Sequence, residues 1–345
     1  MMQKSRIVYF DYLRIIASLA VVFIHVVAYF WTTTEVHTSN FNSLNLYDSI
    51  TRWAVPIFVM ISGTLFLGNE RSIRSLYFKN IFRLVFVFFA WSIIYVIIEH
   101  DEVSAEYIAS SIITGHFHMW FIIMICGLYV LVPFLNVIVK EDKLVIYAFV
   151  LLFIFSCLLP WMTLTVNYTG FTFLIRVFNA ISEDIGYIFI TMITGYIGYF
   201  LAGYYINKKD IPRIVRFIIY GLGIIGFVMT YLLTKRVSYS KGFPVNEYYG
   251  DSTLNIMFTS IAVFVFAKYN LSRLKEYKVI KFLSDCSLGA YLVHMLVFDL
   301  IIDKVLPISE NYFKLVPFIS VIVFVVSFII SAILNKLKGL LKLIV

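Results

Sequence analysis

The sequence predicts an all-α integral membrane protein, a polytopic helical bundle with about 10 transmembrane helices. Of its 345 residues, 61% are hydrophobic and 14% are charged, and the mean hydropathy is +0.90. Soluble domains contain about 45–50% apolar and about 25% charged residues, so the departure is large. Apolar runs of spanning length recur along the whole chain, separated by short polar stretches.

Ten apolar runs are predicted to span the membrane. They cover residues 9–31, 47–67, 81–98, 119–139, 144–164, 185–206, 214–233, 253–267, 282–302 and 315–334. A further apolar stretch, residues 107–114, is too short to span and is expected to lie at the interface or to re-enter. The longest polar connection, residues 234–251, is too short to fold alone. We therefore expect a single membrane domain over residues 1–345 with no appended soluble domain.

Basic residues are distributed unevenly between the predicted loops. With the N-terminus inside, twenty of the 28 Lys and Arg residues lie on the cytoplasmic side and seven on the other, with Arg14 inside the first span. This bias follows the positive-inside rule and places both termini in the cytoplasm. It also accounts for the net charge of +8 without nucleic-acid binding. The expected location is a membrane bordering the cytoplasm, which the chain crosses many times.

The first predicted helix carries ionisable residues at a regular spacing. A charged residue at a helix centre costs roughly 2.5–3.5 kcal/mol to insert, so Asp11 and Arg14 need a reason to be there. They can pair because they are three residues apart. His25 follows Arg14 by eleven residues, almost three helical turns, so both face the same way about 16 Å apart, with Ser18 between them. This face is expected to line the bundle interior or a water-filled cavity, although a snorkelling arginine and a histidine bonded to another helix remain structural alternatives.

Other polar residues are weaker candidates for a site. Ser287, Tyr291 and His294 share one helix face, which permits a Ser–His pair but more often marks a helix–helix contact. His116 and His118 would not face each other on a helix, and no metal site is expected. Three cysteines in apolar runs do not suggest a disulfide framework. No nucleophile-elbow or Walker pattern occurs, which argues against serine hydrolases and nucleotide-driven pumps.

Five short motifs occur in order along the chain. They are F-D-Y-L-R at 10–14 with V-F-I-H at 22–25, R-W-A-V-P-I-F-V-M-I-S-G at 52–63, R-S-I-R at 71–74, H-M-W-F at 118–121 followed by Tyr129 and Pro133, and S-L-G-A-Y-L-V-H at 287–294. Together they resemble the acyltransferase 3 family of bacterial membrane proteins. They are most similar to its stand-alone members, which O-acetylate surface polysaccharides and the enterobacterial common antigen. Val59 stands where the family usually has a second Phe.

The resemblance implies a membrane O-acyltransferase, an O-acetyltransferase in particular. The donor would be acetyl-CoA or another acyl-CoA from the cytoplasm, and the acceptor a hydroxyl of a cell-surface or lipid-linked glycan. It assigns catalytic roles to His25, Arg14 and Asp11, and acyl-CoA binding to Arg71 and Arg74. The other motif positions, with Ser18, are expected to line the cavity: His118, Trp120, Ser287, Tyr291 and His294. Partners would be the lipid bilayer and the machinery of glycan synthesis, with no permanently bound cofactor.

The chemistry is consistent with these roles. A sugar hydroxyl is a poor nucleophile near neutral pH, and a histidine can act on it as a general base or carry the acyl group itself. Arginine forks suit the phosphates of CoA. The main alternative is a transporter or flippase for a glycan or lipid-linked sugar, because polar residues inside a bundle also mark substrate paths. A membrane partner without activity and an acyltransferase-like sensing domain are further alternatives.

Overall fold

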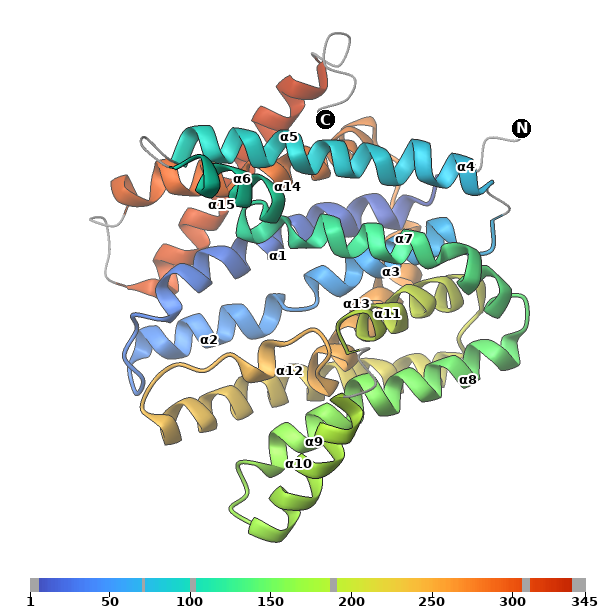
Figure 1. The fold of residues 1–345 in the computed structure, drawn as a ribbon, viewed down its shortest axis with the longest axis vertical. Helices are drawn as coiled ribbons and strands as arrows, with labels where there is room; N and C mark the ends of the chain where they lie inside the picture. The colour runs from blue at the N-terminus through green and yellow to red at the C-terminus, as the bar shows by residue number, and fades with distance from the viewer. Residues whose placement is uncertain (1–5, 70–71, 100–103, 187–190, 306–310, 337–345) are drawn as a thin grey trace.

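The computed structural model describes residues 6–69, 72–99, 104–186, 191–305 and 311–336, and these residues form helices without strands. The helices run mostly alongside one another across the molecule (Figure 1). The longer ones are α1 (Val8–Trp31), α5 (Phe82–Glu99), α7 (Trp120–Ile138), α8 (Asp142–Phe153), α11 (Thr191–Lys208), α12 (Arg213–Lys241), α13 (Leu254–Asn270), α14 (Lys278–Val305) and α15 (Tyr312–Lys336). The shorter ones are α2 (Ser39–Thr51), α3 (Ala54–Phe66), α4 (Ile73–Leu76), α6 (Ala105–Thr114), α9 (Leu159–Val166) and α10 (Thr172–Gly186).

Nine helices in the described ranges are long and apolar enough to cross a membrane. They correspond to nine of the ten predicted spans, which confirms the fold class. The remaining prediction, residues 185–206, falls partly on residues 187–190, which lie outside the described residues, and continues as α11. The short apolar stretch at 107–114 becomes α6, which packs against α5. Helix α10 was not anticipated, and it pairs with α9 in a hairpin that projects from the bundle (Figure 1).

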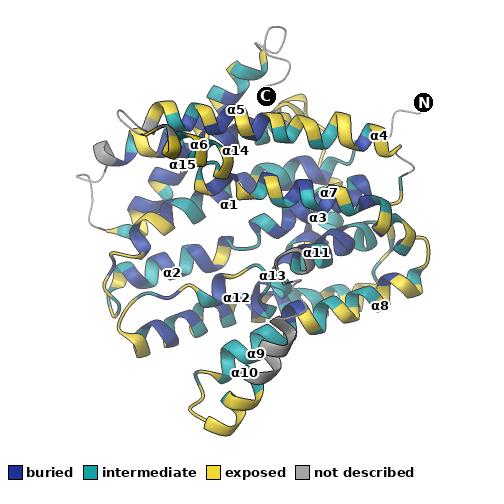
Figure 2. Ribbon diagram, viewed as in Figure 1, coloured by how far each residue is buried: buried dark blue, intermediate teal, exposed yellow. Residues whose placement is uncertain are grey.

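Helix α1 lies at the centre of the bundle. It packs against α2, α3, α14 and α15. Buried residues therefore line much of α1 and α3, whereas exposed residues cover the outward faces of α4, α5 and α8 (Figure 2). Many exposed residues of the outer helices are large and apolar, including Ile97 on α5, Phe134 on α7 and Tyr147 on α8, as contact with lipid chains requires.

The second span is longer than predicted and is broken in its middle. It covers Ser39–Phe66, and α2 ends at Thr51 before α3 begins at Ala54. Pro56 explains the position of the break, because proline has no N–H to donate to the carbonyl of Arg52 four residues earlier. Arg52 lies at this break, inside the predicted span of residues 47–67.

Helices α3 and α11 approach each other closely. A Cβ added to Gly63 would lie 1.9 Å from the carbonyl oxygen of Phe200, and one added to Gly203 would lie 2.0 Å from that of Met60. Glycine permits such backbone contact, which membrane helices use to pack without a hydrophobic driving force. This contact fixes α3, and with it the broken span, against the rest of the bundle.

Candidate active site

A cavity of about 140 Å³ lies between α1, α3, α7, α14 and α15, and we call it the first cavity. It is lined by eight residues that the sequence had singled out: Arg14, Ser18, His25, His118, Trp120, Ser287, Tyr291 and His294. The helical spacing of α1 thus placed three of these side chains on the correct face. Residues more than 260 positions apart in the sequence meet here because α14 packs along α1.

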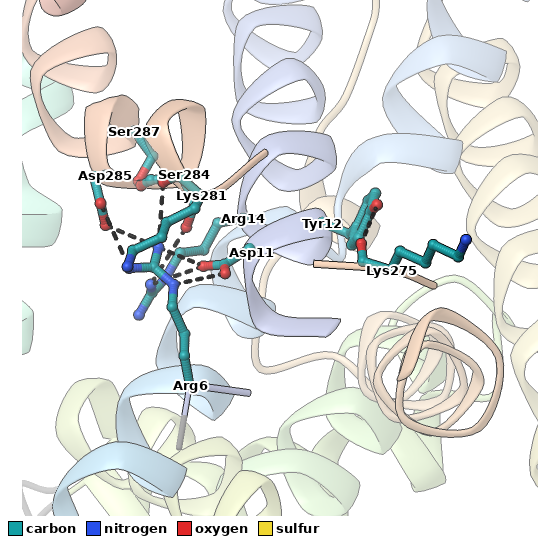
Figure 3. A network of polar contacts seen from close by, with 9 residues as sticks. All are labelled: Arg6, Asp11, Tyr12, Arg14, Lys275, Lys281, Ser284, Asp285 and Ser287. Atoms are coloured by element: carbon teal, nitrogen blue, oxygen red, sulfur yellow. Dashed lines mark hydrogen bonds and ion pairs between the residues drawn. The ribbon is translucent and has the colours of Figure 1, made fainter. Parts of the chain in front are cut away.

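The Arg14 end of the first cavity is held by a network of charges (Figure 3). The guanidinium of Arg6 donates to both carboxylate oxygens of Asp11, at 2.7 and 2.8 Å, and to Asp285 at 2.9 Å. Arg14 Nη1 lies 4.0 Å from Asp11 Oδ1 and 3.5 Å from the hydroxyl of Ser284. The bonds to Asp11 raise the pKa of Arg6, so its positive charge persists. Asp11 itself is buried behind Arg14 and does not line the cavity.

His25 lies among other aromatic rings at the opposite end. Its ring centroid is 5.0 Å from that of His294, 6.3 Å from that of His118 and 5.6 Å from that of Phe117. Within the described part of the chain, no protein group forms a hydrogen bond with His25. Its two ring nitrogens are therefore available to a substrate, which a histidine serving only as a helix–helix contact would not offer.

His294 has a defined tautomer. Its Nδ1 lies 2.5 Å from the carbonyl oxygen of Tyr291, and a carbonyl can only accept, so Nδ1 carries the proton. Nε2 then holds a lone pair, and it is buried with no partner among the described residues. The Ser–His pair that the sequence permitted is not formed, because the hydroxyl of Ser287 donates to the backbone of Ser284 instead.

The turn before α7 brings two further histidines together. His116 precedes a short 3₁₀ turn, Phe117–Met119, and His118 is the middle residue of that turn; their Nδ1 atoms are 2.5 Å apart. The expectation that they would not face each other assumed a continuous helix, and it is wrong because His116 adopts an extended conformation between α6 and α7. The hydroxyl of Tyr291 donates to the carbonyl of His118, which ties this turn to α14.

A second, wider cavity of about 810 Å³ adjoins the first, and we call it the second cavity. Val21, His25, Val55 and Trp120 line both cavities. Most other residues of the second cavity were not anticipated as site residues: Arg52, Trp161, Tyr196, Asn246, Tyr249 and Asp251. Arg52 could have been named as a site residue, because it is the first residue of the motif at 52–63. Asp251 gave none, because an acidic residue in a polar connection resembles any solvated loop residue.

Of the two arginines expected to bind acyl-CoA, the structure describes Arg74, which does not line the first cavity. Arg71 lies outside the described residues. Arg74 is exposed on α4 and borders a shallow apolar groove with Tyr77 and Phe78. Across the described ranges, no group of three or more His, Cys, Asp or Glu side chains is arranged to hold a metal ion.

Comparison with known proteins gives one match. The sequence model of a family described as an acyltransferase domain, the acyltransferase 3 family, matches residues 7–336. No curated protein and no solved structure matches the chain. The match covers both cavities and every helix that lines them.

Proposed function

Because the chain belongs to the acyltransferase 3 family of membrane acyltransferases, we propose that it transfers an acyl group, acetyl in particular, from acyl-CoA to a hydroxyl of a glycan. The acceptor is a cell-surface or lipid-linked glycan, and the protein acts in the cytoplasmic membrane of a bacterium. The observation that carries this proposal is the position of His25, which lines both cavities and whose ring nitrogens form no hydrogen bond with the described residues. Two substrates in adjoining cavities can meet only at a group that both cavities share.

His25 performs the proton transfer that the reaction needs. As a general base it takes the proton of the acceptor hydroxyl while the hydroxyl oxygen bonds to the thioester carbon. The carbon–sulfur bond then breaks, and the proton passes to the CoA thiolate. In the alternative route a ring nitrogen of His25 attacks the thioester carbon, the carbon–sulfur bond breaks and CoA leaves as its thiolate. The acceptor hydroxyl then takes the acyl group from the acyl-imidazole, His25 is regenerated, and the proton of the hydroxyl passes to the thiolate. His294 lies beside it, and its Nε2, which has no partner in the described part of the chain, can accept a proton from a charged His25.

Arg14 supports the donor side of the reaction. It lies at the end of the first cavity next to Arg6, which also donates to the carbonyl of Lys281, while Tyr12 donates to the carbonyl of Lys275 (Figure 3). CoA brings several phosphate charges that guanidinium and ammonium groups bind well. We assign the thioester arm to the first cavity, running from Arg14 towards His25. Arg71 and Arg74 are proposed contacts for CoA phosphates at the cytoplasmic mouth.

The role of His25 is tested by a conservative substitution. His25→Gln keeps the size and hydrogen bonding of the side chain but removes the base and the nucleophile, so acylation should fall by at least about 100-fold. Glycan acylation is measured by mass analysis in cells that express wild-type or variant protein at matched membrane levels. Substantial acylation by His25→Gln would show that His25 is structural and that this mechanism is wrong.

A further inference from the structure

The second cavity differs from the first in its chemistry. Its volume of about 810 Å³ lies within the range of roughly 300–1,000 Å³ typical of small-molecule sites. Aromatic rings and a few polar groups make up its walls, notably Trp120, Trp161, Tyr249, Arg52, Asn246 and Asp251. Trp120 is 40% exposed although it lies inside the bundle, so its ring faces open space. These walls offer stacking surfaces and directed hydrogen bonds in one place.

The positive charge of Arg52 is already neutralised by the protein. Its guanidinium is ion-paired with buried Asp48 and lies 4.6 Å from the ring centroid of Tyr249. Among the described residues the guanidinium donates one hydrogen bond, from Nη2 to Asp48, out of the five N–H donors that it carries. Because the side chain is 22% exposed and lines the cavity, an oxygen atom of a ligand there can accept from the remaining donors. Arg52 thus offers a hydrogen bond without offering a net charge.

Asp251, which also lines the second cavity, is held by two tyrosines of α11. Its Oδ2 accepts a hydrogen bond from the hydroxyl of Tyr196 at 2.6 Å, and its backbone carbonyl accepts one from Tyr199 at 2.7 Å. A carboxylate can accept about four hydrogen bonds, so further acceptor positions remain for a ligand. A carboxylate in the wall also disfavours phosphate or carboxylate groups on that ligand.

A pyranose ring has the chemistry that these walls would recognise. One of its faces carries C–H groups that pack on aromatic rings, and its edge carries hydroxyls that donate to a carboxylate and accept from a guanidinium. We propose that the second cavity binds the acceptor as a neutral pyranose unit, with Trp120 and Trp161 stacking on its ring and Asp251 and Arg52 bonding its hydroxyls. This assignment rests on the acyltransferase function proposed above. The hydroxyl directed at His25 is the one acylated.

Binding of simple glycosides to the full chain in lipid nanodiscs tests this assignment. The probes are methyl α-D-glucopyranoside, its N-acetylglucosamine counterpart and methyl glucuronide as a charged analogue, followed by saturation-transfer NMR. The neutral glycosides should bind several-fold more tightly than the glucuronide. Asp251→Asn keeps the acceptor for Tyr196 but weakens the bonds to sugar hydroxyls, so the Kd of the neutral glycosides should rise about tenfold. Trp161→Leu should raise the Kd of the neutral glycosides by a similar factor. This variant tests the site if Asp251→Asn fails to insert into the membrane.

Asp142→Asn is the matched control. It makes the same chemical change at the start of α8, where Asp142 is partly exposed and pairs with Lys208 and Lys209 outside both cavities. Glycoside binding should be unchanged in this variant. CoA binding, measured on every sample, should match the wild type in all three variants.

Each result decides between the proposals. Failure of the wild type to bind neutral glycosides, a preference for the glucuronide, or equal Kd values in wild type and Asp251→Asn would overturn the acceptor site. Asp251-dependent glycoside binding by a protein that neither binds CoA nor transfers an acyl group would keep the sugar site and overturn the acyltransferase function instead.

Discussion

Asp11 and Asp285 both accept hydrogen bonds from Arg6, but their surroundings differ. The side chain of Asp11 is 3% exposed and that of Asp285 is 52% exposed. Replacing a buried carboxylate that pairs with two cations leaves buried charges uncompensated and is strongly destabilising. An exposed ion pair contributes at most about 1 kcal/mol to the free energy of unfolding. Asp11 lies outside the cavity lining, so we interpret it as a positioning residue for Arg14, with no direct part in the chemistry.

Substitution of the two aspartates should separate these roles. Asp11→Asn should raise the KM for acyl-CoA roughly tenfold with a smaller change in kcat, because Arg14 loses a charge that fixes it. Asp285→Asn should change the KM less than about threefold, as expected for an exposed pair. Steady-state kinetics with purified protein measures both. A fall in kcat alone for Asp11→Asn would instead assign Asp11 a direct catalytic role.

The sequence predicted those residues of the site that recur at the regular spacing of one helix. Arg14, Ser18 and His25 could be placed on one face because α1 is an uninterrupted helix from Val8 to Trp31. The contact between His116 and His118 could not be predicted from helical spacing, because it depends on an interruption between α6 and α7 where His116 is extended. Asp251 meets His25 in the second cavity only after distant helices pack, and no local pattern encodes that packing.

At the scale of elements, the broken second span and the close contact of α3 with α11 shape the site. The break between α2 and α3 carries Arg52 to the second cavity, while Val55 at the start of α3 lines both cavities. The spans themselves were predictable from apolar runs. The break could not be predicted, although Pro56 marked its position. A proline can stand in the first turn of a new helix or inside a kinked helix, and the sequence alone does not distinguish the two cases.

The packing of α3 on α11 gives a prediction about stability. Gly203→Ala places a methyl group against the backbone of Met60, which cannot move aside as a flexible side chain would. We expect destabilisation of about 1–3 kcal/mol or more and a lower yield in the membrane. Gly221→Ala is the matched control, because a Cβ there meets no atom within 4 Å. Thermal unfolding in detergent measures both, and equal melting temperatures for the two variants would contradict the close contact.

At the scale of the whole molecule, the proposed donor cavity and the proposed acceptor cavity meet at His25, which lines both. The uneven distribution of basic residues predicts that the Arg14 end lies in the cytoplasm, where acyl-CoA is available. In the proposed reaction the acyl group passes from this end to an acceptor in the second cavity, so neither whole substrate has to cross the membrane.

The sidedness of the donor, measured in native membranes, tests this account most directly. Inverted and right-side-out vesicles are prepared from cells that carry the gene, supplied with radiolabelled acetyl-CoA on the outside, and assayed for label in their glycans. Inverted vesicles, which expose the cytoplasmic face, should incorporate label, whereas right-side-out vesicles should not, and vesicles with His25→Gln should incorporate none in either orientation. Equal labelling in both orientations, or labelling that persists in His25→Gln, would contradict the claim that the substrates meet at His25 from opposite faces.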